Sequence, residues 1–168
     1  AYAASLYGSP TRTIKNISQF FRESITWSAL SIAGISLRYN DPGFIFDTKG
    51  QCIFSDDPNL LRRIMALMNS SLVAEFMRIM APTLDFNSGT IAKTPYVESP
   101  NNSSIIQIAE SCTALARTDW DNFETSWDFR DMPLLRSATK AATLAASWGA
   151  WRDQCVSAAR RMQELETE

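Results

Sequence analysis

The sequence predicts an α+β fold, in which a small, largely antiparallel sheet with packed helices is followed by a long C-terminal helix. Segments typical of strands occur only before residue 98. Apolar residues at helical spacing dominate the rest of the chain, and the most regular of these runs ends it. The length of 168 residues fits one domain of ordinary size, or one domain with an appended helix.

Strand signals begin in the segment FFRESITWS, residues 20–28, which is rich in aromatic and β-branched side chains. The segment ISLRY alternates between two faces: Ile35, Leu37 and Tyr39 on one, Ser36 and Arg38 on the other. Two further strand-like segments, GFIFD (43–47) and QCIF (51–54), flank Thr48-Lys49-Gly50. A three-residue connection that contains glycine is typical of a β-hairpin, so we expect these two segments to pair.

Helical signals follow at Asp56 and Asp57, because acidic residues before Pro58 are typical of a helix start. Apolar residues then recur at helical spacing through residue 80, and the polar residues 69–71 are expected to kink this helix or divide it in two. After Pro82 the sequence predicts a strand, a turn at Ser88-Gly89 and an extended exit to Pro95.

The segment ESPNNSS, residues 98–104, is the best linker candidate, because it is a polar cluster with a proline. We therefore predict an α+β domain over 1–97 and a helical region over 98–168. The helical region should hold a helix over 103–117 and a loop with one helical turn around buried Trp120, Phe123 and Trp127. A final helix from about Ser137 carries an apolar seam with heptad spacing: Ala141, Leu144, Trp148, Trp151, Cys155, Ala158, Met162 and Leu165. Such a seam requires a partner helix, and we expect the natural protein to continue beyond this pattern.

Composition excludes several classes of function. The chain is 45% hydrophobic and 20% charged, as a soluble globular protein is, and it has no apolar run long enough to span a membrane. It has no histidine, which removes the usual general base and the commonest metal ligand. Its three cysteines, Cys52, Cys112 and Cys155, are spaced for neither a disulfide framework nor a metal site. We assign no catalytic, cofactor-binding or metal-ligating residue, and we expect a cytoplasmic protein without a membrane partner.

Charge is distributed unevenly along the chain. Residues 1–93 hold nine Lys/Arg against seven Asp/Glu, whereas residues 94–168 hold seven against eleven. A weakly basic front half fits a domain that contacts nucleic acid on one face. The carboxylates at 119, 121, 124, 128 and 131 could form an acid/base or metal site, but caps and a solvated face are the commoner role of such a cluster.

Three segments carry a resemblance to a known family. The stretch from Phe20 to Phe54, with its Ile-Thr-Trp-Ser run, its alternating strand with Arg38 and its Gly-Phe-Ile-Phe-Asp run, resembles the start of the recognition region in BREX-type adenine-specific DNA methyltransferases. Residues 67–97 are similar to that family's Asn-Ser helix, Pro-Thr-Leu segment and Gly-x-Ile exit, and residues 119–129 to a later stretch. Asp85 departs from the asparagine that is commoner there.

The resemblance implies a target-recognition fragment and the start of a helical spacer, cut from a bacterial or archaeal N6-adenine DNA methyltransferase that takes part in phage defence. The parent enzyme uses S-adenosylmethionine, but this chain lacks a glycine-rich cofactor loop and a Pro-Pro pair, so it should be non-catalytic and bind no cofactor by itself. The implied partners are double-stranded DNA, the catalytic domain of the same chain and other BREX components.

Candidate DNA contacts follow from the basic residues of the front half and from the polar positions of its strands. They are Arg12, Lys15, Arg22, Thr26, Ser28, Arg38, Asn40 and Lys49. Two other functions remain open at this point. The chain could be a protein-interaction or assembly module of the same enzyme without direct DNA contact, or a small hydrolase that uses the carboxylates between 119 and 131.

Overall fold

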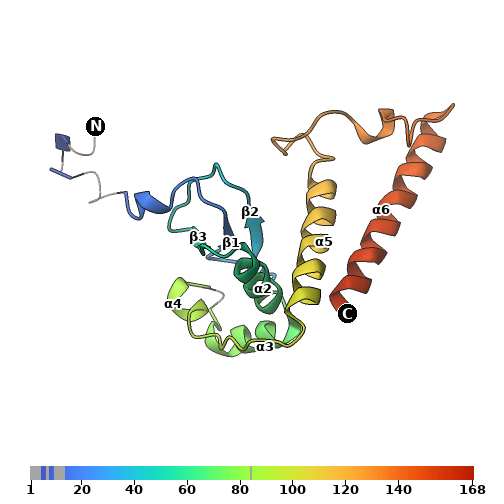
Figure 1. The fold of residues 1–168 in the computed structure, drawn as a ribbon. Helices are drawn as coiled ribbons and strands as arrows, with labels where there is room; N and C mark the ends of the chain where they lie inside the picture. Colours follow the sequence, from blue (N-terminus) through green and yellow to red (C-terminus); the bar gives the residue numbers. More distant parts are fainter. Residues whose placement is uncertain (1–4, 7, 10–13, 84) are drawn as a thin grey trace. The chain divides into compact units, whose positions relative to one another are not determined.

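The computed structural model describes residues 5–6, 8–9, 14–83 and 85–168 of the chain. It divides into two compact units, Ala1–Asn102 and Ser103–Glu168 (Figure 1). The first unit holds the three strands and the helices α2 to α4, after a short 3-10 helix, η2 (Ile17–Gln19). The second unit is helical.

The sheet of the first unit has three strands in the order β2-β1-β3, and both pairings are antiparallel. β1 (Ser24–Ser28) lies in the middle, between β2 (Arg38–Asn40) and β3 (Gly50–Ile53). Ile25 and Trp27 are 0% and 2% exposed, because a strand that is paired on both sides and covered on one face contributes most to the core. The prediction of an α+β fold with a small antiparallel sheet is confirmed.

The predicted hairpin across Thr48-Lys49-Gly50 is wrong. β3 pairs with β1, and residues 44–47 form no strand. The carboxylate of Asp47 accepts the backbone N–H groups of Lys49 at 2.8 Å and Gly50 at 2.9 Å, which closes a side-chain-capped turn in place of a strand end. Pairing with β1 places β3 beside a strand whose apolar side chains are buried. The segment that contains Phe44 is exposed and gives β3 no such neighbour.

The helix after Pro58 divides in two, as its polar interruption indicated. α2 (Pro58–Met68) starts at Asp57, whose side chain accepts the N–H of Asn59 at 2.9 Å. α3 (Ser71–Met80) starts at Ser70, whose hydroxyl accepts the N–H of Val73 at 3.3 Å. Both helices pack apolar side chains into one core with β1 and its surroundings: Ile25, Trp27, Ala29, Leu37, Leu61, Met65, Met68, Val73, Met77, Ala81, Phe86 and Ile91.

The segment after α3 differs from its prediction. The expected strand is reduced to a single bridge between Asp85 and Leu30, and the expected turn at Ser88-Gly89 is the start of a short helix, α4 (Ser88–Ile91). Asn87 caps this helix by accepting the N–H of Thr90 at 3.0 Å, a local bond that favours a helical turn over an open one. The backbone carbonyl of Phe86 accepts the indole N–H of Trp27 at 2.7 Å, so this segment closes the core.

The second unit contains α5 (Asn102–Trp120), a loop with the 3-10 helix η3 (Pro133–Leu135), and α6 (Leu144–Thr167). The expected helix over 103–117 is confirmed as part of α5. The expected start of the last helix at Ser137 is wrong, because α6 begins seven residues later. Thr139 donates its hydroxyl to the carbonyl of Pro133, and the side chain of Thr143 accepts the N–H of Ala146 at 3.2 Å. Hydroxyl bonds of this kind hold the preceding residues in turns and set the helix start at Leu144.

The apolar seam of α6 is exposed at its start, half-buried from Trp151 to Met162 and buried at Leu165. Leu165 is 4% exposed, whereas Trp148 and Leu144 are 52% and 73% exposed, and Ala141 lies before the helix. Burial raises the pKa of the Cys112 thiol on α5, and the charge of Glu166 on α6 raises it further. Glu166, in the last turn of α6, therefore lies near enough to Cys112 for its charge to act on the thiol.

Candidate nucleic-acid interface

The register of the strands gathers four of the predicted residues on one face of the sheet. Thr26 lies opposite Arg38, and Ser24 lies opposite Asn40. Residues directly opposite one another point to the same side of a sheet, and so do residues two apart along a strand. Thr26, Ser28, Arg38 and Asn40 therefore share the face turned away from the buried Ile25 and Trp27. We call this the outer face of the sheet.

Arg38 is the charged residue of the outer face. Its side chain is exposed, and its Nη2 donates to the hydroxyl of Ser28 at 3.1 Å. Among the described residues, no carboxylate forms an ion pair with Arg38. A guanidinium carries five N–H donors in a rigid fork, so this single bond orients the group and leaves most of its donors for a ligand.

Lys49 lies at the same end of the sheet as Ser28 and Arg38. Its backbone carbonyl accepts the N–H of Ala29 at 3.0 Å, directly beyond the pair formed by Ser28 and Gly50, and its side chain is exposed. Its position opposite Ala29, which is 5% exposed, puts Lys49 in register with the inner side of the sheet, so Ser28 and Arg38 alone make up the polar end of the outer face described here. Asp47 adjoins this end, and the N–H groups that it accepts from Gly50 and Lys49 lower its pKa.

Two predicted residues of the outer face serve the fold itself. The hydroxyl of Thr26 donates to the carbonyl of Gln51 at 2.9 Å and links β1 to β3. Asn40 is half-buried opposite Ser24, which is 3% exposed. Hydroxyls and amides that are bonded or covered in this way are less available to an incoming ligand than the exposed end formed by Ser28 and Arg38.

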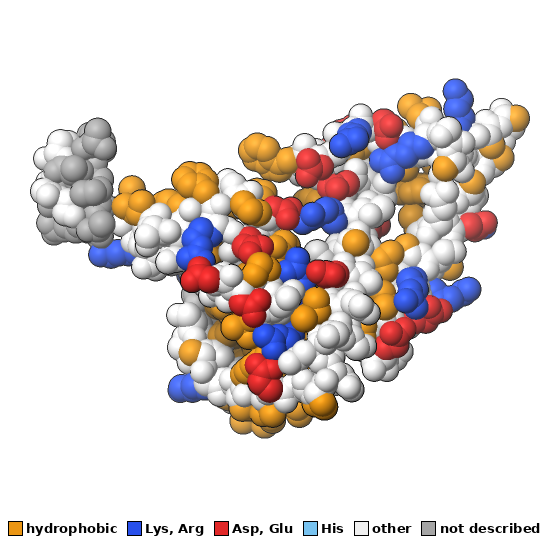
Figure 2. All heavy atoms as spheres, viewed as in Figure 1, with side chains coloured by type: hydrophobic (Ala, Val, Ile, Leu, Met, Phe, Trp, Pro, Cys, Tyr) orange, Lys and Arg blue, Asp and Glu red, His pale blue; other side chains and the backbone are white. Residues whose placement is uncertain are grey.

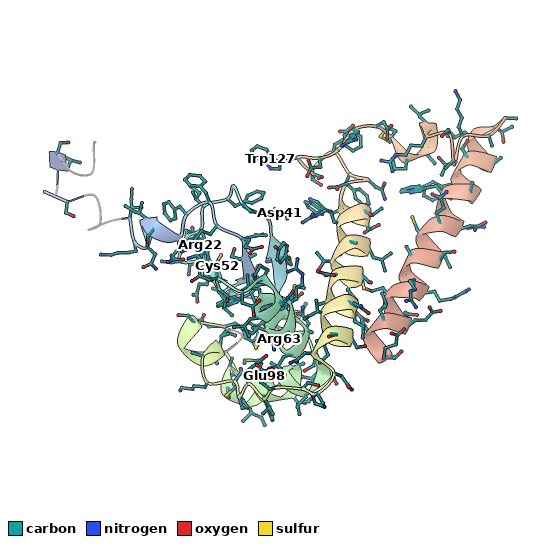
Figure 3. All side chains as sticks on the ribbon, viewed as in Figure 1. Arg22, Asp41, Cys52, Arg63, Glu98 and Trp127 are labelled. Carbon is teal, nitrogen blue, oxygen red and sulfur yellow. The ribbon has the colours of Figure 1, made fainter. Side chains whose placement is uncertain are left out.

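The remaining predicted residues lie away from that end. Arg22 is neutralised by an ion pair with Asp56 at 2.5 Å, and it also donates to Gln19 at 2.7 Å (Figure 3). The structure therefore does not join it to Arg38. Lys15 is exposed just before η2, and Arg12 lies outside the described residues. Sequence reasoning treated these basic residues alike, because an ion pair over 34 residues of separation leaves no local signal.

Sequence reasoning missed the residues that hold β2 in place. The side-chain amide of Asn69 accepts the N–H of Leu37 at 2.8 Å and donates to the carbonyl of the same residue at 3.0 Å. Tyr39 donates its phenol hydroxyl to Glu23, and the guanidinium carbon of Arg62 lies 5.6 Å from the centre of the Tyr39 ring. Burial raises the pKa of Tyr39 to about 12, and the hydrogen bond to Glu23 raises it as well. In the sequence, the signal for this contact was the asparagine at the helix break. Its partner, Leu37, lies 32 residues away.

A further arginine ties the end of the first unit to α2. Arg63 donates to Glu98 at 2.7 Å and lies 3.5 Å from Asp57, with a side chain that is 15% exposed (Figure 3). Positive and negative side chains intermingle on the face of the first unit that Figure 2 shows, without a large area of one sign. The exposed charge of Arg38 on the outer face is thus a local feature rather than part of a broad basic surface.

The first unit also holds a cavity of about 380 Å³. Apolar side chains predominate in its lining: Trp27, Cys52, Ile53, Ile64, Leu67, Met68, Ser88, Ile91, Ala92, Thr94 and Tyr96. The hydroxyl of Thr94 is buried there without a hydrogen-bond partner among the described residues. Its lining combines buried Trp27, Met68 and Ile91 with exposed Ser88 and Tyr96, so it is an open pocket beside the sheet, α2 and α4.

The carboxylates between residues 119 and 131 take local structural partners. Asp121 accepts the hydroxyl of Ser126 at 2.6 Å, and Asp131 pairs with Arg136 at 2.6 Å. Within the described part of the chain, no group of three potential metal-ligating side chains forms. The expectation that this loop surrounds three buried aromatic residues is wrong: Trp120, Phe123 and Trp127 are 56%, 48% and 96% exposed (Figure 3). The loop that follows α5 has little regular structure, and it therefore does not bury these aromatic side chains.

No helix within the described residues is long and apolar enough to cross a membrane. The first unit belongs to the class of small α+β modules, and its outer sheet face carries the exposed Arg38.

Comparison with known proteins identifies its relatives. No protein-family profile matches the chain. The chain is 32% identical over 151 residues to the adenine-specific methyltransferase PglX of Lacticaseibacillus casei strain Zhang, across 88% of its own length. It is 31% identical over 143 residues to the adenine-specific methyltransferase BrxX of Escherichia coli O9:H4 strain HS, across 84% of its length. The chain spans 12% of the length of either relative. It is a PglX-like relative of the BREX adenine-specific methyltransferases, and this confirms the resemblance found in the sequence.

Proposed function

We propose that the chain is the DNA target-recognition part, with the start of the helical spacer, of an N6-adenine DNA methyltransferase in a BREX-like phage-defence system. Its similarity to two adenine-specific methyltransferases over 84–88% of its length, but over only 12% of theirs, supports a role as one part of a large enzyme. The chain has six scattered glycines and no Pro-Pro pair, so methyl transfer and S-adenosylmethionine binding belong to another part of that enzyme.

The division of labour within the chain follows its two kinds of structure. The α+β region over 1–97 contacts double-stranded DNA, and the helical region over 98–168 belongs to the spacer. The other partners are the catalytic domain of the same polypeptide and further BREX components, in the cytoplasm of a bacterium or archaeon. This assignment rests on the family relation and on the outer face of the sheet.

The single observation that carries the proposal is the exposed guanidinium of Arg38, which Ser28 orients at 3.1 Å and which has no ion-pair partner in the described part of the chain. Arginine reads the two acceptors on the major-groove edge of guanine with two parallel donors, and this is the commonest specific contact to DNA. Lys49, at the same end of the sheet, is suited to a phosphate contact, which positions the protein without reading sequence. The oriented guanidinium of Arg38 is suited to a specific contact with guanine, and such a contact does not require a broad basic surface.

The test uses the full-length methyltransferase that contains this sequence, expressed in cells whose DNA is then sequenced for methylated adenines. Arg38→Ala should relax the methylated motif at one base position, because a bidentate contact contributes about 1–3 kcal/mol of discrimination. Arg78→Ala is the matched control, since Arg78 is also an exposed arginine of the first unit but lies on α3 beside Glu75 at 2.7 Å. An unchanged motif at reduced methylation in the Arg38 variant would reject base reading by this residue.

A second candidate function is a protein-interaction or assembly module of the same enzyme. Exposed aromatic residues in the second unit favour it, since Trp127 and Trp148 are 96% and 52% exposed. Under this alternative, Trp148→Ala would weaken assembly of the enzyme while Arg38→Ala would leave both binding and motif intact. The two variants, compared in one assay of DNA retention and one of assembly, separate the two functions.

A further inference from the structure

We propose that Asn69 is a positioning residue for Arg38: it holds the start of β2 through a double hydrogen bond and thereby sets where the arginine fork points. The inference rests on the proposed role of Arg38 in reading DNA. Asn69 lies at the break between α2 and α3, so this break would contribute to sequence specificity.

The strand that carries Arg38 has few restraints of its own. β2 is three residues long, lies at an edge of the sheet and pairs only with β1. The residues from Ser31 to Leu37 that lead into it belong to no helix or strand. A short edge strand that follows an irregular segment is free to shift its register or fray, and either change moves the side chain at its first position.

Asn69 supplies the missing restraint at the residue directly before Arg38. Its amide oxygen accepts the N–H of Leu37 at 2.8 Å, and its amide nitrogen donates to the carbonyl of Leu37 at 3.0 Å. An amide side chain that bonds both groups of one residue replaces the partner strand that β2 lacks on that side. The side chain of Leu37, 3% exposed, is fixed in the core at the same point.

Asn69 is itself held on a rigid support. It ends α2, and its backbone N–H donates to the carbonyl of Met65 at 3.1 Å. The neighbouring Met68 and Val73 are 4% and 1% exposed, so the junction of α2 and α3 is anchored in the core. A ligand-contacting group acts accurately when a second layer of residues locks its position, and this junction is such a layer.

The residue after Arg38 is held independently. Tyr39 donates to Glu23 on the segment before β1, and Arg62 of α2 lies over its ring at 5.6 Å. Arg38 is thus fixed from both sides along the chain, by Asn69 through Leu37 and by Glu23 through Tyr39. Its own backbone pairs with Thr26. Of these restraints, Asn69 is the one that acts on the irregular side of the strand.

The experiment compares substitutions in the full-length methyltransferase, with the methylated motif as the main result. Asn69→Leu keeps a similar size and removes both bonds to Leu37. Asn69→Asp keeps the acceptor for the N–H of Leu37 and loses the donor, so it is the milder variant to use if leucine impairs folding. Ser70→Ala is the matched control: it removes the cap of α3, a bond of 3.3 Å to the N–H of Val73, without touching Leu37.

We expect Asn69→Leu to relax the motif at the same base position as Arg38→Ala, by at least about fivefold, the lower end of the range for one bidentate contact. Asn69→Asp should relax that position less. The double variant with Arg38→Ala should relax it no further than Arg38→Ala alone, because residues that act through one another are not additive. Ser70→Ala should lower the melting temperature and leave the motif intact.

Two results would overturn the inference, and they differ in what else they reject. If Arg38→Ala relaxes the motif while both Asn69 variants only lower total methylation, Asn69 has a structural role alone and the function proposed for Arg38 stands. If Arg38→Ala itself leaves the motif unchanged, both the reading role of Arg38 and the positioning role of Asn69 are rejected. Equal relaxation in Ser70→Ala would trace the effect to general loss of stability.

Discussion

At the scale of single residues, the first unit separates side chains that build the fold from those left free to bind. Arg22 and Arg38 were both candidates in the sequence, yet Arg22 is 2.5 Å from Asp56, while the guanidinium of Arg38 donates to the neutral Ser28 and has no ion-pair partner among the described residues. An exposed ion pair adds about 0–1 kcal/mol to stability but cancels the charge that a phosphate or a guanine would attract. The partner of each arginine, rather than its identity, therefore decides which one is suited to DNA.

A prediction at this scale concerns Tyr39, whose pKa burial and the bond to Glu23 raise to about 12. A tyrosine in an unfolded chain titrates near pH ~10, so folding favours the neutral phenol. Its contribution to stability is complete below about pH 10 and is lost as the pH rises through about 12. Tyr39→Phe should therefore lower the free energy of unfolding at neutral pH, and its difference from wild type should shrink above about pH 10. Urea unfolding of both proteins at several pH values measures this, and a difference that stays constant to the highest pH would contradict it.

At the scale of elements, local capping signals agree with the structure where the capping side chain lies next to the helix. Asp57-Pro58 marks the start of α2, and the polar break near Ser70 separates α2 from α3, as the sequence indicated. Strand pairing behaves differently, because the partner of a strand is chosen by long-range burial. β3 pairs with β1 rather than with its neighbour in sequence, since the apolar side of β1 gives it a covered position.

A second prediction tests the start of α6. Thr143 accepts the N–H of Ala146 at 3.2 Å as the cap of this helix, whereas Ser137 lies in the turns before it. Replacing a capping threonine by alanine costs about 1 kcal/mol. Thr143→Ala should therefore lower the free energy of unfolding by about that amount, while Ser137→Ala, an exposed site outside the helix, should change it by less than about 0.5 kcal/mol. Chemical denaturation followed by circular dichroism compares them, and equal effects would place the helix start elsewhere.

At the scale of the whole molecule, the chain consists of two units that differ in structure. The first unit has a mixed core and a polar outer face, and the second is helical, with large apolar side chains left exposed. Single-sign charge does not dominate the visible surface of the first unit, which favours a specific contact over indiscriminate attachment to nucleic acid (Figure 2). Both features fit one part of a long enzyme, in which other segments supply chemistry and further binding surface.

The prediction that belongs to this scale concerns the cofactor. The chain by itself should bind no S-adenosylmethionine and methylate no DNA, because its glycines form no cofactor loop and no Pro-Pro pair is present. Isothermal calorimetry of the 168-residue chain with S-adenosylmethionine checks this, with the full-length enzyme as the positive control. Micromolar binding by the isolated chain would reject the proposed division of labour.

The sequence by itself determined the features that depend on near neighbours. The aromatic and β-branched residues of segment 20–28 predicted a strand, Asp57-Pro58 predicted a helix start, and three family segments predicted the relation to adenine-specific methyltransferases. Only the tertiary structure decided what depends on residues far apart. It paired β3 with β1, cancelled the charge of Arg22, and set the amide of Asn69 against the backbone of Leu37, 32 residues away. The physical reason is that periodicity and caps act within one or two turns of chain, whereas pairing, burial and charge compensation form only when distant segments meet.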